Sequence, residues 1–174
     1  MKGARDFLIA NQPLPDAKDV SQEALTSFVA IIDEFDSTPD DGLIPLLLGA
    51  MGDGFGAGTY QVLSHMLAER PRDVLESPLK GAFASPHAGT RFSAASVAAG
   101  THDEVYASSL VKLLDDVDAD VRWAATSAMA SMPCPIVDRA FRSHIERFRD
   151  ESVGEPSDSF DSVAVTAKAG PGRE

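Results

Sequence analysis

The chain has 174 residues, of which 44% are hydrophobic and 24% are charged, proportions that suit a globular domain with its own core. Lys and Arg number 15 against 27 Asp and Glu, so the formal net charge is -12 and the isoelectric point is about 4.6. This balance disfavours nucleic-acid binding, which depends on neutralising phosphates, and favours a basic protein partner. The oligomeric state stays open.

The sequence predicts a cytoplasmic protein with no membrane partner. Cys134 is the single cysteine, so no internal disulfide can form and a reducing compartment is expected. No stretch approaches the roughly 20 apolar residues that span a bilayer. The apolar run at 7–10 is too short for the core of a signal peptide.

In chain order, the first predicted helix follows an irregular lead-in. Residues 1–20 contain two prolines and mixed charge, which predict an irregular segment. Ser21 is a candidate helix cap, and apolar residues recur at three- and four-residue spacing from Leu25 to Phe35. An amphipathic helix is therefore expected, and it ends in the Asp-, Pro- and Gly-containing stretch at 36–42.

The remaining chain divides into helical units and a tail. We expect a helical domain over 21–149 and a disordered acidic tail over 150–174, because the tail is rich in Ser, Gly and acidic residues. The helical domain comprises pairs at about 43–70, 72–100 and 103–132 and a capping helix at 135–149.

One segment repeats at an offset of 31 residues, where 85–99 aligns with 116–130. A repeat of this length with a helical pattern predicts an all-α fold, a short right-handed α-solenoid of about three helix pairs with leading and capping helices. The matched positions are Arg91 with Arg122, Phe92 with Trp123, Ala94 with Ala125, Ser96 with Ser127 and Ala99 with Ala130.

The third unit resembles a HEAT or HEAT-like repeat. In residues 113–125 an apolar pair ends the first helix, an Asp precedes the second, and Val-Arg-x-Ala-Ala opens it. The resemblance covers roughly 43–132 and implies that Asp118 caps the second helix. It also implies that Arg122 pairs with Asp side chains along the stack. In the preceding unit His87 stands in the place of Asp118.

A row of side chains is predicted to face away from the core. On a helical wheel Trp123 lies about 200° from the core residue Val121, and its repeat equivalents are Phe92 and Gln61. The resemblance implies that second helices line the concave surface, so this row, joined by Thr126, would be a partner-binding site. The alternative is that Trp123 fills a gap against a neighbouring helix.

An acidic turn is the second candidate for partner binding. Asp115, Asp116, Asp118 and Asp120 could steer a basic partner, and the alternative is helix capping with a solvated turn. The spacing of these acids lacks the Gly and the terminal Glu of an EF-hand loop.

The glycine-rich segment at 52–58 is not preceded by a strand and is not followed by the Lys of a phosphate-binding loop. We predict no metal site and no cofactor.

No residue pattern indicates a catalytic site, since neither a nucleophile elbow nor a Cys–His signature is present. We expect a non-catalytic protein-binding module, with an immunity or antitoxin-type inhibitor of a basic toxin as the more specific hypothesis. Two classes stay open as alternatives, a ligand-handling HEAT-like lyase or chaperone-type protein and a HEAT-like DNA glycosylase. The glycosylase would need a basic groove.

Overall fold

The computed structural model describes residues 2–15, 18–53 and 58–153, and within these ranges the protein is helical with no β-strand. The predicted all-α fold class is confirmed. Short 3-10 helices, η1 (Asp41–Leu43) and η3 (Glu104–Tyr106), precede α3 and α7. The α-helices are α1 (Lys2–Ala10), α2 (Gln22–Ser37), α3 (Ile44–Ala50), α4 (Thr59–Ala68), α5 (Arg72–Phe83), α6 (Ala88–Thr101), α7 (Ala107–Leu113), α8 (Ala119–Ala130) and α9 (Pro135–Val153).

The chain divides into two units, residues 1–140 and 141–174. The first unit holds α1 to α8 and the start of α9. In the second unit α9 continues to Val153, past the predicted helix end at residue 149. The rest of the predicted tail, 154–174, lies outside the described residues. Among the helices that the structure describes, none combines the length and the apolar character needed to cross a bilayer.

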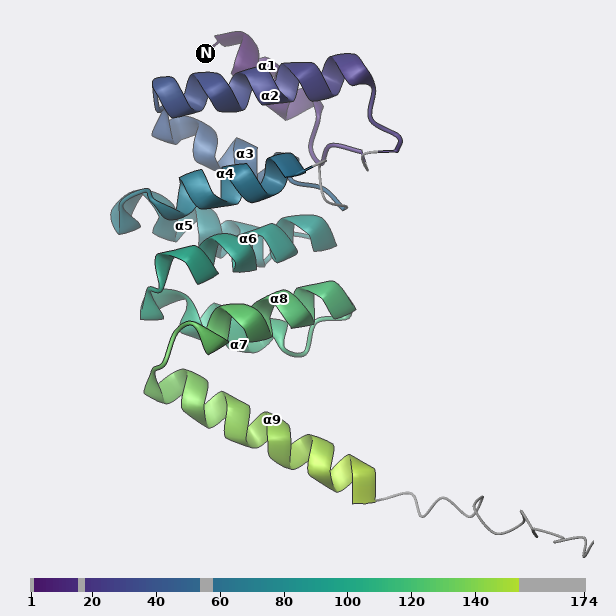
Figure 1. The fold of residues 1–174 in the computed structure, drawn as a ribbon, viewed down its shortest axis with the longest axis vertical. Helices are drawn as coiled ribbons and strands as arrows, with labels where there is room; N and C mark the ends of the chain where they lie inside the picture. The colour runs from purple at the N-terminus through teal and green to yellow at the C-terminus, as the bar shows by residue number, and fades with distance from the viewer. Residues whose placement is uncertain (1, 16–17, 54–57, 154–174) are drawn as a thin grey trace, which may run out of the picture. The chain divides into compact units, whose positions relative to one another are not determined.

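Helices of the first unit alternate between two layers as the chain advances (Figure 1). In one layer α2, α4, α6 and α8 lie side by side in that order, and in the other α1, α3, α5 and α7 do the same. Because α5 also packs on α6 and α7 on α8, each consecutive pair contributes one helix to each layer. This packing is consistent with a stack of helix pairs.

The N-terminal segment differs from the sequence prediction, because Lys2–Ala10 form α1 where an irregular lead-in is expected. Ala4 and Leu8, four residues apart, are buried. The segment after α1 is attached to the end of α3, because the Leu14 N–H donates a hydrogen bond to the Ala50 carbonyl at 3.0 Å. Two buried positions are too few to give a periodic signal, and packing on α3 supplies the stability that a nine-residue helix lacks alone.

The contact between α6 and α8 is built from two helices rich in buried alanine. Ala94, Ala95 and Ala98 of α6 and Ala124, Ala125 and Ala128 of α8 are all buried. Small side chains allow two helix axes to approach closely, since the interaxial distance depends on the residues at the contact. The exposed side chains at the edge of this contact are therefore brought near one another.

The start of α6 docks on the segment after α3. His87 occupies the cap position but its side chain makes no capping hydrogen bond, and the Asp53 carboxylate from the preceding pair takes that role. The Asp53 carboxylate accepts from the Gly89 N–H at 2.7 Å, and the Thr90 hydroxyl donates to the Met51 carbonyl at 3.0 Å. A Cβ on Gly89 would collide with the backbone of Gly52, so this approach requires glycine.

We predict that Gly89→Ala lowers the free energy of unfolding by about 2 kcal/mol, because the added methyl group forces two backbone segments apart. Urea denaturation measures the change. Gly81→Ala is the matched control, since Gly81 lies in α5 and a Cβ there meets nothing within 4 Å. The control should be neutral or more stable by up to about 1 kcal/mol. Equal losses in both variants would contradict the close-approach argument.

Candidate functional site

Two aromatic side chains stack on one another at the exposed edge of α6 and α8. The ring centroids of Phe92 and Trp123 lie 6.5 Å apart with an interplanar angle of 12°. Trp123 is 66% exposed, whereas Val121, Ala124 and Ala125 on the same helix are buried. The helical wheel thus placed Trp123 outside the core, and the repeat correctly aligned Phe92 with it. Ring stacking at this distance lies within the usual range for aromatic pairs.

A bidentate ion pair joins Arg91, the residue before Phe92, to Asp116 in the turn before α8. The Arg91 guanidinium donates from Nε and Nη2 to the two carboxylate oxygens of Asp116, each at 2.7 Å. Only 12% of the Arg91 side chain and 8% of the Asp116 side chain are exposed. Arg91 also donates to the Ser85 carbonyl at 2.9 Å, and Asp116 accepts from the Asp118 N–H at 2.9 Å. These bonds tie α6 to the turn between α7 and α8.

The ion pair perturbs both of its members. The hydrogen bond from Arg91 lowers the pKa of the Asp116 carboxyl; burial opposes this, and the Asp118 N–H assists it. The hydrogen bond to Asp116 correspondingly raises the pKa of the Arg91 guanidinium. Both shifts favour the charged forms, so the attraction outweighs the cost of burial.

The acidic turn has members with different roles. Asp118 caps α8 and accepts from the N–H groups of Asp120 at 2.9 Å and Val121 at 3.1 Å. The Asp116 carboxylate is occupied by its ion pair with Arg91, and little of it is accessible to solvent. Asp115 and Asp120 are exposed. Of the four predicted acidic residues, Asp115 and Asp120 therefore have the most accessible side chains.

The Arg122 guanidinium donates hydrogen bonds to the turn that precedes α8. Its Nη1 donates to the carbonyl oxygens of Asp116 at 2.7 Å and Val117 at 3.1 Å. The arginine–aspartate pairing along the stack, which the family resemblance suggests for Arg122, is made one repeat earlier by Arg91. Thr126, one turn after Trp123, is exposed and its hydroxyl donates to the Arg122 carbonyl at 2.8 Å.

An aromatic–acidic pocket of about 340 Å³ opens beside the stacked rings. Phe92 and Trp123 form its apolar wall, and Ala88 and Gly89 at the start of α6 also border it. Its acidic side is formed by Asp53, Asp118 and Asp120. Sequence reasoning missed Asp53, because its place in a glycine-rich segment gave no sign that it reaches the next helix pair.

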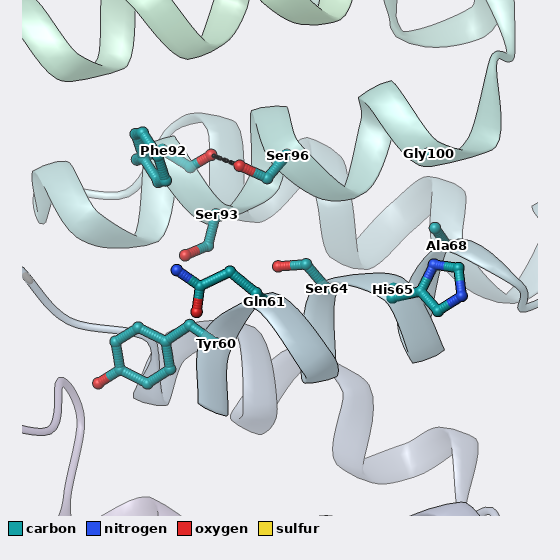
Figure 2. Close-up of a pocket in the computed structure, with 9 residues that line it drawn as sticks. All are labelled: Tyr60, Gln61, Ser64, His65, Ala68, Phe92, Ser93, Ser96 and Gly100. Carbon is teal, nitrogen blue, oxygen red and sulfur yellow. Dashed lines mark hydrogen bonds between the residues drawn. The ribbon is translucent and has the colours of Figure 1, made fainter. Parts of the chain in front are cut away.

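A second pocket of about 280 Å³ lies on the other side of Phe92, between α4 and α6 (Figure 2). Gln61, which sequence reasoning placed in the same row as Phe92 and Trp123, lines this pocket. Figure 2 shows the Gln61 side chain and the hydroxyl groups of Ser64 and Ser93 turned into the gap between the two helices. The predicted row therefore forms a continuous edge across α4, α6 and α8, with Phe92 as the wall shared by two pockets.

The described side chains include no group of three or more His, Cys, Asp or Glu residues placed to hold a metal ion. Cys134 is buried and does not form a disulfide.

Comparison of the chain with protein-family models and with curated protein sequences gives no match. The geometry and charge of the face formed by α4, α6 and α8 are therefore the features that bear on function.

We predict that Asp116→Asn lowers the free energy of unfolding by about 3 kcal/mol at pH 7, because Arg91 is left largely buried without its counter-charge. Chemical denaturation measures this loss. Asp115→Asn removes the same charge from an exposed position on the same turn, where an interaction is worth about 1 kcal/mol at most, so the loss should be clearly smaller. Similar losses in both variants would show that the ion pair is not the cause.

The pH dependence of stability provides an independent test of the ion pair. Because the pKa of Asp116 is lower in the folded protein than its ordinary value of 3.8, the ionised carboxylate stabilises the fold above that value. This contribution is lost as the pH falls through the folded-state pKa. The stability difference between wild type and Asp116→Asn should therefore be constant from pH 6 to 8, roughly, and shrink below about pH 4. A pH-independent difference would contradict the assignment.

Proposed function

We propose that this protein is a non-catalytic module that binds a basic protein through the face formed by α4, α6 and α8. The observation that carries the proposal is the exposed Trp123, held by stacking on Phe92 next to an acidic pocket. Tryptophan is enriched among the residues that dominate binding energy at protein interfaces. A side chain that is already ordered before binding also loses less entropy when a partner docks.

The charge of the chain supports a basic partner. The formal net charge of -12 creates a field that accelerates the approach of a positively charged protein at low salt. Asp120 contributes accessible charge beside the aromatic pair, and Asp115 is exposed on the turn before α8, whereas the Asp116 carboxylate is occupied by Arg91. An inhibitor that blocks a basic toxin is the finer form of this proposal, and it is supported by the charge alone.

The 31-residue repeat and the alternating layers support a HEAT-like arrangement of the helix pairs. In such a stack, equivalent positions of successive second helices form a row, and here that row is Gln61, Phe92 and Trp123. A row of this kind suits an extended surface on a partner, because each repeat adds a contact at a regular interval.

Affinity capture from a host extract at low salt, with elution by rising salt, is the first experiment. We expect a basic protein to elute, and its affinity for the purified chain to fall as ionic strength rises. Trp123→Ala should weaken that binding by about 2 kcal/mol, close to 30-fold, when measured by titration calorimetry. Ile9→Ala on α1 is the matched control, because Ile9 is also a large exposed apolar side chain and should leave affinity unchanged.

Three results would count against the proposal. The first is a partner whose affinity is unaffected by Trp123→Ala or by salt. The second is a small absorbing molecule that co-purifies in place of a protein, which would favour the ligand-handling alternative. Measurable binding of duplex DNA at physiological salt would instead favour the glycosylase alternative, despite the acidic charge.

A further inference from the structure

We propose that the aromatic–acidic pocket receives the guanidinium group of an arginine side chain from the basic partner. This inference rests on the proposed function and specifies the chemistry of the partner. The pocket has about 340 Å³ of space, an apolar wall of Phe92 and Trp123, and the carboxylates of Asp53, Asp118 and Asp120.

The electrostatics of the pocket favour a cation. Three carboxylates line it, and no Lys, Arg or His side chain is among the described residues that do so. Residues at the starts of α6 and α8 both line the pocket, and each helix start contributes roughly half of a positive charge. The three carboxylates and the two helix starts together still give about two negative charges. The pocket therefore repels an anion and attracts a cation.

Carboxylate oxygens remain available for a ligand in this pocket. Asp53 uses Oδ1 for the Gly89 N–H, and Asp118 uses Oδ1 for the start of α8. Their Oδ2 atoms accept no hydrogen bond in the contacts that the structure describes. Asp120 is exposed, so its carboxylate can turn toward a bound cation. The helix caps and a bound guanidinium thus do not compete for the same oxygen atoms.

The lining of the pocket distinguishes a guanidinium from other cations. A guanidinium is planar, stacks on aromatic faces and carries five N–H donors, so it can lie against Trp123 and reach carboxylates that are spread apart. An ammonium is a compact and strongly hydrated charge that gains less from an aromatic surface. A metal ion needs a tighter ligand cluster, and the described residues offer no such group. The arrangement therefore favours arginine.

Trp123 is the single tryptophan of the chain, so its fluorescence and its indole N–H resonance report directly on this pocket. The full chain is titrated at constant ionic strength with N-acetyl-arginine amide, its lysine analogue and its uncharged citrulline analogue. We expect a saturable change with the arginine probe. The citrulline probe should bind about tenfold more weakly, because a hydrogen bond to a charged group is worth more than a neutral one. The lysine probe should also bind more weakly than the arginine probe.

Asp120→Asn should weaken the arginine probe about threefold, in the range expected for an exposed charge pair. Asp115→Asn is the matched control and should have no effect, since Asp115 does not line the pocket. The proposal is overturned if neither signal of Trp123 saturates, if citrulline binds as well as arginine, or if the two variants weaken binding equally. A partner that still depends on Trp123 would leave the proposed function standing in each of these cases.

Discussion

The largely buried ion pair of Arg91 and Asp116 is the interaction that positions the exposed face of this protein. Its two 2.7 Å hydrogen bonds hold α6 against the turn that leads into α8. Asp116 also accepts the N–H of Asp118, and Asp118 in turn caps α8. Since Phe92 follows Arg91 and Trp123 lies in the second turn of α8, the same pair places the two rings in register. A charged pair with little solvent access is costly unless it is well hydrogen-bonded. Here each guanidinium nitrogen donates a hydrogen bond and both carboxylate oxygens accept one.

The acidic residues at the start of α6 and in the turn and first residues of α8 divide into structural and accessible groups. Asp53 and Asp118 each satisfy backbone N–H groups at a helix start with one oxygen, and Asp116 satisfies an arginine with both. Asp115 and Asp120 are exposed. A strongly acidic composition therefore serves two purposes in this protein, because part of it organises the stack and part of it surrounds a pocket that suits a cation.

Several parts of the candidate site could be predicted from the sequence. The 31-residue offset aligned Phe92 with Trp123, and helical periodicity placed Trp123 outside the core. The resemblance of residues 113–125 to a HEAT-like repeat implied that Asp118 caps a helix, and Asp118 caps α8. The burial of Asp116 could not be predicted, because its partner is 25 residues away and the turn that contains it looks solvated. The capping role of Asp53 could not be predicted either, because the Gly89 N–H that it accepts lies 36 residues further along the chain.

The sequence by itself determined the helical class, the helix pairs and the row of outward-facing positions, because periodicity and capping are local properties of neighbouring residues. Only the tertiary structure decided which acids are accessible, that α1 is a helix, and that Asp53 closes the pocket beside Trp123. The physical reason is that burial, ion pairing and close backbone approach depend on segments that are distant in sequence. Their free energies arise only when the helix pairs stack.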